Sequence, residues 1–386
     1  MTSDASGAAP AAAERLRERF GDEVVLVTGF PGGRAQALLQ VLLEREPEIA
    51  IWLVVPPSEL EASARLLAGN GSEHRRLRLI PGEPCAIDLG LSRQTYSELA
   101  LQVDRWFALY QTSDPTASRE LSLRVNLGAA REVAELCKVA EKLTRVTLLS
   151  SGAVFGDHQG PVSEEELRIG QSFPSSAAQA LALAEALLTR KLSDVPVSIV
   201  RTPQVLRARG QATSLKPSGL HRLLALVASA PTDALLPLPP GSSRVVQAIP
   251  ADFLAEALYA VSVLGTRGHA YHFADPDPPS LLEVLQRAAQ YFGKRFELGG
   301  GARAFGRMLL NSPGFWLSQQ SSRALSEWAA GPPLVTRAGD RLLERAGLRA
   351  PSLLDYLDDV LRETEQLVKS AGLDLPVAST PIEAVA

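Results

Sequence analysis

Apolar and polar positions follow two alternating periods along this chain. Short runs of β-branched and other apolar residues, such as residues 23–29 (EVVLVTG) and 48–57 (EIAIWLVVPP), are typical of buried strands. Between them, apolar residues recur about every 3.6 positions, as in residues 34–46, which is typical of helices. Strands and helices continue to alternate through residues 58–70, 75–83, 103–110, 118–143, 145–152, 173–192 and 195–201. This alternation predicts βαβ units on a parallel sheet.

The pattern changes after residue 206. Stretches rich in Pro and Gly, such as residues 232–244, separate amphipathic helices at 251–265, 278–294 and 350–370. We therefore expect an α/β fold with a parallel sheet and a smaller C-terminal domain. The expected limits are a disordered leader at 1–18, the sheet domain at 19–206, the smaller domain at 207–370 with 245–265 returning to the sheet domain, and a flexible tail at 371–386.

Composition and charge narrow the class of protein. Of 386 residues, 46% are hydrophobic and 21% are charged, which is usual for a globular protein. The formal net charge of −4 gives no general attraction to nucleic acid, so we expect no nucleic acid partner. Cys85 and Cys137 lie in no metal-ligand spacing, and we expect no metal site. The sequence shows neither a signal peptide nor an apolar stretch long enough to span a membrane, so we expect a cytoplasmic protein without integral membrane contact.

The first expected strand ends in a glycine-rich turn. Glycines in such a turn let the backbone approach a pyrophosphate, whose charge lies at the N-terminus of the following helix. The expected cofactor-binding residues are Thr28, Gly29, Phe30, Pro31, Gly32, Gly33 and Ala35. Because the third small position is Ala35 and not glycine, a tight turn without a ligand stays an alternative. Residues 55–58, at the end of the second strand, contain neither the acid that favours NAD nor the arginine that favours NADP.

Further motifs follow in a characteristic order. They are IPGEPCAIDLGLS, VDRWFALY, RVNLGAAREVAELC, LLSSGAVFGDHQGPVSEEEL, VSIVRTP, RVVQAIPADFLAEALYAV and YHFADPDPPSLLEVL. Together with the glycine turn, they resemble the extended short-chain dehydrogenase/reductase superfamily over residues 23–365, in particular its NAD-dependent epimerase/dehydratase and fatty-acyl or thioester reductase branches. The resemblance implies a Rossmann-type doubly wound parallel sheet, which we expect in the strand order 3-2-1-4-5-6, and a smaller C-terminal α+β substrate-type domain. It also implies NAD(P) binding, and catalysis by Ser or Thr, Tyr and Lys with a supporting Asn.

The catalytic residues implied by the resemblance are only partly present. Asn126 matches the supporting asparagine, and Ser151 matches the active-site Ser or Thr. Ala177 stands at the Tyr position and Leu181 at the Lys position, one helical turn later. No Tyr-x-x-x-Lys sequence occurs elsewhere in the chain. Since methyl and isobutyl groups cannot transfer a proton, Asn126 and Ser151 are expected to be remnants of a catalytic site.

The implied cofactor groove is also altered. Glu83 replaces the Asp with which the family contacts adenine, and a carboxylate there can still accept from an amino group. Tyr110 and Gln111 replace small residues that line the groove, so they should crowd the nicotinamide half. We therefore expect weak or absent binding of NAD or NADP, dominated by the adenine and pyrophosphate half at Gly29, Gly32 and Glu83.

The helix expected at residues 177–188 is apolar on nearly every face, with Gln179 and Glu185 as its polar residues. Such a helix must be covered on both sides. A homodimer or heterodimer through this helix is one expectation, in line with the family's intersubunit helix bundle. The alternative is burial by the chain's own substrate-type domain.

Two functions are compatible with these observations. The first is a catalytically silent pseudoenzyme that binds a dinucleotide or serves as a scaffold. The alternative is an active NAD(P)-dependent oxidoreductase on a carbonyl, acyl-thioester or nucleotide-sugar substrate, which would use Ser151 with an atypical proton donor such as His158. The missing Tyr and Lys favour the first function.

Overall fold

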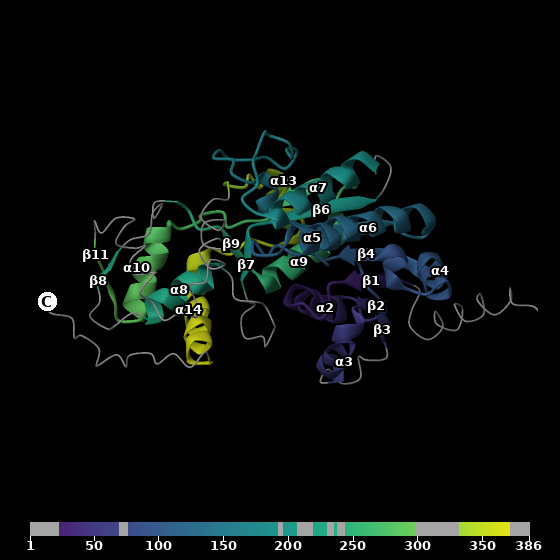
Figure 1. Ribbon diagram of the computed structural model, residues 1–386, viewed down its shortest axis with the longest axis horizontal. Coiled ribbons are helices and arrows are strands. Elements are labelled where there is room, and N and C mark those ends of the chain that lie inside the picture. The colour runs from purple at the N-terminus through teal and green to yellow at the C-terminus, as the bar shows by residue number, and fades with distance from the viewer. Residues whose placement is uncertain are drawn as a thin grey trace, which may run out of the picture. The chain divides into compact units, whose positions relative to one another are not determined.

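Seven parallel strands form the central sheet of this protein, described here from a computed structural model (Figure 1). The structure describes residues 23–68, 76–191, 196–206, 219–229, 235–237, 244–297 and 332–370. The chain divides into two units, the first within Met1–Leu215, Ile249–Ala274 and Gly331–Ala350, and the second within Lys216–Ala248, Asp275–Ala330 and Pro351–Ala386. The leader and the tail expected at 1–18 and 371–386 lie outside the described residues.

The sheet has the strand order β10-β6-β5-β4-β1-β2-β3, and each neighbouring pair is parallel. The expected order 3-2-1-4-5-6 is therefore confirmed, with β10 added at one edge. Strands β1 and β2 are buried along their whole length, which explains why their sequences are continuous apolar runs. The strands are β1 (Val24–Thr28), β2 (Ala50–Val55), β3 (Leu77–Pro81), β4 (Val103–Ala108), β5 (Arg145–Ser151), β6 (Val197–Thr202) and β10 (Ala270–His272).

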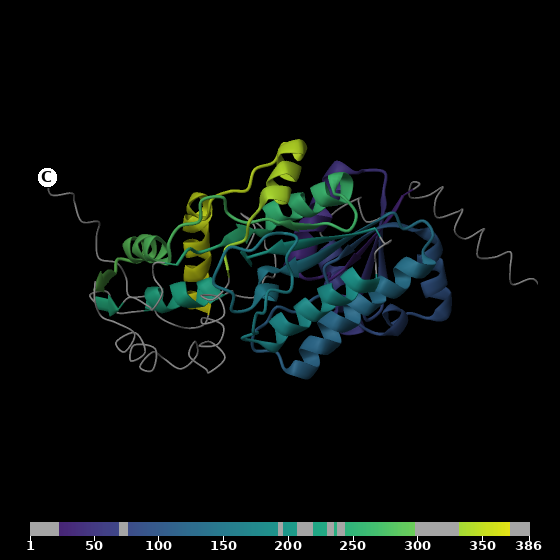
Figure 2. The ribbon, with the colours of Figure 1, turned by 90° about the horizontal axis from the view of Figure 1, so that it is seen from above.

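Helices cover both faces of the sheet, as Figure 2 shows. One apolar layer contains residues of α2 (Gly33–Arg45), α3 (Leu60–Ala68), α9 (Ala251–Leu264) and α13 (Arg337–Ala346). The other contains residues of α4 (Arg93–Gln102), α6 (Gly128–Val139) and α7 (Ser176–Lys191). Short elements connect these, namely η1 (Pro57–Glu59), η3 (Ile87–Gly90), α5 (Arg119–Ser122), η4 (Leu123–Leu127), η5 (Gly152–Phe155), and the paired strands β7 (Gln204–Leu206) and β9 (Ala248–Pro250).

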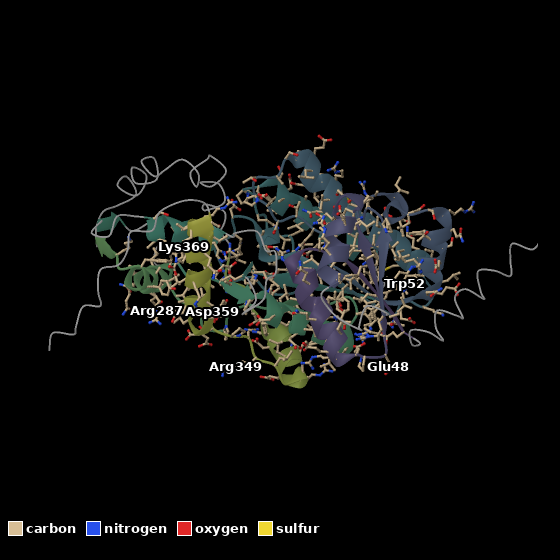
Figure 3. The ribbon with its side chains drawn as sticks, turned by 90° about the horizontal axis from the view of Figure 1, so that it is seen from below. Glu48, Trp52, Arg287, Arg349, Asp359 and Lys369 are labelled. Atoms are coloured by element: carbon tan, nitrogen blue, oxygen red, sulfur yellow. The ribbon has the colours of Figure 1, made fainter. Side chains whose placement is uncertain are left out.

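The second unit is built around α8 (Gly219–Ser229), α10 (Leu281–Tyr291) and α14 (Leu353–Ser370), which pack together, and the paired strands β8 (Leu235–Pro237) and β11 (Arg295–Glu297). Helix α10 begins with a reciprocal capping box between Ser280 and Glu283. On its exposed side, Arg287 pairs with Asp358 of α14 at 2.9 Å. Figure 3 labels Arg287 on α10, and Asp359 and Lys369 on α14. These helices are amphipathic, with apolar faces that pack against each other.

Helix α7 is joined to the sheet by a buried ion pair. The side chains of Glu185 on α7 and Arg201 on β6 are only 1% and 4% exposed, and Glu185 Oε2 lies 2.8 Å from Arg201 Nη2. Arg201 Nε donates to the same oxygen at 2.9 Å, and the Ser150 hydroxyl of β5 donates to Glu185 Oε1. Because a lone buried charge is very costly, each partner needs the other. The pair therefore fixes the position of α7 against β5 and β6.

The guanidinium of Arg201 also organises the loop before α7. Its Nη1 donates to the carbonyl oxygens of Glu164 at 3.1 Å and Glu166 at 2.9 Å. The carboxylate of Glu164 in turn accepts from the backbone N–H groups of Ala338 and Gly339, both at 2.8 Å. These groups belong to the first turn of α13, where a negative charge is favoured. One network thus connects β6, the 163–166 loop and α13.

A neutral histidine completes this network. His272 Nδ1 lies 2.9 Å from the carbonyl oxygen of Val335, so this nitrogen carries the hydrogen. His272 Nε2 then accepts from Arg201 Nη1 at 3.2 Å. Burial, and next the charge of Arg201, lower the pKa of His272 to about 3. The ring is therefore uncharged at physiological pH.

The Glu185–Arg201 pair yields a stability prediction. Glu185→Gln leaves Arg201 buried without a counter-charge, and we expect it to lower the free energy of unfolding by about 3–5 kcal/mol. The matched control is Glu61→Gln, because Glu61 and its partner Arg65 are 84% and 74% exposed and such pairs contribute about 0–1 kcal/mol. Urea denaturation followed by circular dichroism measures both. A loss below about 1 kcal/mol for Glu185→Gln would contradict this role.

His272 yields a pH prediction. Between pH 6.5, its ordinary pKa, and about 3, its folded pKa, the unfolded chain binds a proton that the folded chain does not. Stability should therefore fall as the pH is lowered through this window, by up to about 1.4 kcal/mol per pH unit from this residue. We expect His272→Gln to flatten the pH dependence relative to His269→Gln, a change at an exposed histidine. Equal pH slopes in the two variants would show that His272 is not the titrating group.

Candidate functional site

The candidate site lies at the carboxyl ends of the strands, where β1 and β4 are neighbours and the strand order reverses. Ligands of open α/β sheets bind in the crevice at this point. Four features predicted from the sequence meet at this edge. They are the turn after β1, Glu83 after β3, residues 110–112 after β4, and Ser151 at the end of β5.

The turn after β1 requires glycine at two positions. Gly29 has a φ of +99°, and a Cβ added to it would lie 2.8 Å from the carbonyl carbon of Leu109. At Gly32, an added Cβ would lie 2.7 Å from the carbonyl oxygen of Gly29, whereas its own N–H donates to that oxygen at 2.9 Å. Side chains at either position would clash with backbone atoms. The predicted turn is thus as tight as its sequence suggests.

The helix after this turn has a free N-terminus. Gly32 is the N-cap of α2, no side chain caps the helix, and its first turn contains no acidic residue. The first N–H groups of a helix lack intrahelical acceptors and carry a partial positive charge. This arrangement suits an anion such as a pyrophosphate.

The other predicted residues of the turn serve packing. Thr28, Phe30 and Ala35 are at most 2% exposed, and Thr28 Oγ1 accepts from Trp106 Nε1 at 3.4 Å. The carbonyl oxygen of Pro31 accepts from Gln36 Nε2 at 2.5 Å. The side chains of Thr28, Phe30 and Ala35 are therefore turned into the core and do not line the site.

Glu83 and Tyr110 are joined by a hydrogen bond. The Tyr110 hydroxyl donates to Glu83 Oε1 at 2.7 Å. Burial, and next this hydrogen bond, raise the pKa of Tyr110, so the phenol stays protonated. The thiol of Cys85 donates to the same oxygen at 3.3 Å, and burial raises its pKa to about 11. The carboxylate expected to contact adenine is thus already engaged by the chain itself.

Gln111 lies on the other side of the crossover. In the amide orientation that satisfies its neighbours, Gln111 Nε2 donates to the carbonyl oxygen of Leu149 on β5, and its Oε1 accepts from Arg34 Nη1, both at 3.1 Å. Arg34 is the second residue of α2, and burial lowers its pKa. Sequence reasoning did not single out Arg34, although an arginine next to the glycines of such a turn is a visible signal.

Asn126 binds the backbone of the segment that carries Tyr110 and Gln111. Its Oδ1 accepts from the N–H of Thr112 at 2.8 Å, and its Nδ2 donates to the carbonyl oxygen of Thr112 at 2.9 Å. The side chain is 3% exposed and lies in η4, a π-helical turn, a conformation common at functional sites. Both polar atoms of Asn126 are therefore used to hold Thr112.

Ser151 lies where the sequence predicts, at the end of β5. Its hydroxyl oxygen accepts from the N–H of Ala153 at 3.2 Å, and it caps η5. Helix α7 packs against both β5 and η5. Ser151 therefore has a structural role as a cap, and its hydroxyl hydrogen can still be donated.

The face of α7 that should carry the catalytic pair is apolar and buried. Ala177 and Leu181 are 1% and 4% exposed. Leu181 belongs to an apolar cluster with Val154, Phe155 and Val162 of the loop after Ser151. The structure thus brings Ser151 and this helix together without any proton donor at position 177 or 181.

Helix α7 is covered largely by its own unit. It packs against α5, η4, α6, η5 and β5. Leu183 is its exposed large apolar residue, at 43%.

Glu185 fixes this helix through its ion pair with Arg201. The sequence marks it only as a polar residue on an apolar helix. Its signal was a single acid within an apolar helix, which requires a buried partner.

An extended dinucleotide would meet side chains of the chain itself at this site. The turn and the start of α2 suit its pyrophosphate. On the adenine side, however, Tyr110 is hydrogen-bonded to Glu83, and on the nicotinamide side Gln111 is hydrogen-bonded to Arg34.

Within the described ranges, no group of His, Cys, Asp and Glu could hold a metal ion. The helices in the described part of the chain include none that is long and apolar enough to cross a membrane.

Comparison with solved structures identifies the fold. The terminal R domain from the myxalamid PKS-NRPS biosynthetic pathway matches with a TM-score of 0.75 and 18% identity, over 92% of this chain and 93% of that chain. The reductase domain of a nonribosomal peptide synthetase from Mycobacterium tuberculosis matches with a TM-score of 0.68 and 18% identity, over 91% of this chain and 92% of that chain. The dTDP-glucose 4,6-dehydratase from Bacillus anthracis str. Ames, in complex with NAD, matches with a TM-score of 0.62 and 15% identity, over 91% of this chain and 100% of that chain.

Comparison with protein families agrees with the sequence resemblance. No curated protein matches the chain by sequence. The family model described as "Male sterility protein", an NAD-binding family, matches residues 27–258, which is more than half of the chain. Its range begins in β1, includes the glycine turn and Ser151, and ends in α9. The chain therefore belongs to the NAD-binding male sterility protein family, within the extended short-chain dehydrogenase/reductase superfamily.

Proposed function

We propose that this chain is a catalytically silent member of the superfamily, a pseudoenzyme that binds a dinucleotide weakly or serves as a scaffold. One observation carries the proposal. Ala177 and Leu181, at the positions of the catalytic Tyr and Lys, are buried at 1% and 4% exposure, and Leu181 belongs to an apolar cluster. Neither residue has a proton to transfer.

The chemistry of the family supports the proposal. Hydride transfer to a carbonyl carbon develops negative charge on the oxygen, which an acid within hydrogen-bond reach must neutralise. Ser151 can donate one hydrogen bond, but a serine hydroxyl is too weak an acid to supply the proton alone. Loss of general acid catalysis lowers rates by about 100- to 10,000-fold.

The alternative is an active NAD(P)-dependent oxidoreductase on a carbonyl, acyl-thioester or nucleotide-sugar substrate. The similar R domains, the free N-terminus of α2 and the retained Ser151 support it. It needs an atypical proton donor, for which His158 is the candidate. However, a Cβ added to Gly160 would lie 3.1 Å from His158 Nε2, so this ring lies against its own loop. This contact favours a structural histidine.

We propose that any binding of NAD or NADP is weak and depends on the turn backbone at Gly29 and Gly32. We also propose that the protein is cytoplasmic and forms a homodimer or heterodimer through α7. The support for a dimer is the exposed apolar surface of this helix and its neighbours, with Leu183 on α7 at 43% and Val139 on α6 at 51% exposure. Helices α6 and α7 pack together, so both belong to one layer.

The dimer proposal predicts the effect of a charge on this surface. Leu183→Lys should dissociate the homodimer, because an unpaired ammonium in an apolar contact is costly. Leu66→Lys on α3, in the layer on the other face of the sheet, is the matched control, because Leu66 is 44% exposed, and it should leave the mass unchanged. Light scattering measures both. A wild type that remains monomeric at high concentration would rule out the homodimer.

The silent-enzyme proposal predicts no measurable turnover. Wild type should neither reduce nor oxidise a panel of aldehydes, acyl thioesters and nucleotide sugars with NADPH, NADH or their oxidised forms. Ser151→Ala should be equally inert. Its control is Ser92→Ala, because Ser92 Oγ also caps a helix, accepting from the N–H of Thr95 at 3.2 Å. Turnover by wild type that persists in Ser92→Ala and disappears in Ser151→Ala would refute the proposal.

A further inference from the structure

We propose that residues 110–112 form an intrachain plug that closes the dinucleotide groove, and that Asn126 is the positioning residue that holds this plug in place. The inference rests on the proposed function and deepens it, because it identifies what keeps the cofactor out. It concerns binding alone, whereas the silence of the site rests on positions 177 and 181. The two can therefore be tested separately.

On the adenine side, Tyr110 spans the groove. Tyr110 follows β4 and Glu83 follows β3, and the order β4-β1-β2-β3 places two strands between them. Because neighbouring strands are about 4.8 Å apart, the two strands are separated by about 14 Å. The hydrogen bond of 2.7 Å between their side chains therefore bridges the carboxyl ends of β1 and β2. An adenosine that crosses this edge must displace the phenol ring.

On the nicotinamide side, Gln111 fills the corresponding position. It connects the end of β4 with Leu149 of β5 and, through Arg34, with the first turn of α2. Arg34 Nε has no hydrogen-bond partner among the described residues. A nicotinamide leaving the glycine turn towards Ser151 meets these two side chains. Consecutive residues of one segment thus close both halves of the groove.

Asn126 fixes the backbone of the plug. It satisfies both the N–H and the carbonyl oxygen of Thr112 from a side chain that is 3% exposed. Only a primary amide offers a donor and an acceptor in this arrangement. Asn126 thus acts through Thr112, which follows Tyr110 and Gln111 directly. Its role in this chain is to hold the segment, because both polar atoms of its side chain bind the backbone of Thr112.

The plug is held by a few hydrogen bonds, one to the carboxylate of Glu83, one from the guanidinium of Arg34 and the others between neutral groups. Each is individually modest, since a hydrogen bond in the folded chain replaces one to water. The segment can therefore be released by substitution without removing a strand or helix of the fold. Release should raise the affinity for a dinucleotide, because the binding-competent groove becomes the populated state.

The test compares wild type with Tyr110→Ala/Gln111→Ala by isothermal titration with ADP, NADH and NADPH. We expect the double variant to bind ADP and at least one dinucleotide about tenfold or more tightly than wild type. Tyr110→Phe keeps the ring but releases Glu83, and it should bind more weakly than the double variant. Tyr96→Ala removes a tyrosine of similar burial on α4 and should behave as wild type. Circular dichroism confirms that each variant is folded.

A second variant tests the positioning role of Asn126. Asn126→Ala should speed hydrogen exchange at the Thr112 amide and increase the affinity for ADP, while exchange in β1 stays as in wild type. A general loss of protection, β1 included, would make Asn126 merely structural. Unchanged exchange at Thr112 would contradict its role.

The outcomes separate the plug from the silent site. If wild type binds dinucleotides as tightly as the double variant, or if neither binds, the plug is refuted. Wild type that binds tightly but shows no turnover would refute the plug and leave the silent site in place. If the double variant binds and turns over, the plug is supported, and the loss at Ala177 and Leu181 is not what silences the chain.

Discussion

The buried ion pair between Glu185 and Arg201 is the interaction on which the candidate site depends. It fixes α7 to β5 and β6 through a carboxylate that is almost fully shielded from water. The same guanidinium holds the 163–166 loop, and Glu164 of that loop meets the first turn of α13. Neither ion tolerates the loss of its partner, so the helix, the loop and the edge of the sheet are retained together.

In the proposed silent enzyme, this constraint explains how the fold persists without the chemistry. The catalytic pair of the family would occupy positions 177 and 181, two turns and one turn before Glu185 on the same helix. Ala177 and Leu181 pack in the apolar interior and contribute to burial, whereas Glu185 carries the charge that orients the helix. The proton relay and the structural ion pair are therefore separate functions of one helix. Loss of the proton relay leaves the ion pair that holds α7 to the sheet in place.

Much of this could be predicted from the sequence, because it depends on local pattern. The strand order, the glycine turn and the place of Ser151 follow from apolar periods and from turn chemistry. The contact between Tyr110 and Glu83 could not, since it joins residues 27 positions apart across two intervening strands. The sequence also could not show which elements cover α7. An apolar helix predicts that it is buried, but it does not identify the elements that bury it. Asn126 was predicted as a catalytic remnant, and the structure adds its bonds to Thr112.

Single-turnover hydride transfer tests the central claim most directly. Wild-type protein, in excess over NADPH or NADH deuterated at either face of C4, would be incubated with an aldehyde or an acyl thioester. Mass spectrometry would then measure deuterium in the reduced product. A silent site predicts no transfer above that in a protein-free sample, because no acid reaches the developing oxyanion. Transfer from one face alone, lost in Ser151→Ala, would contradict the account.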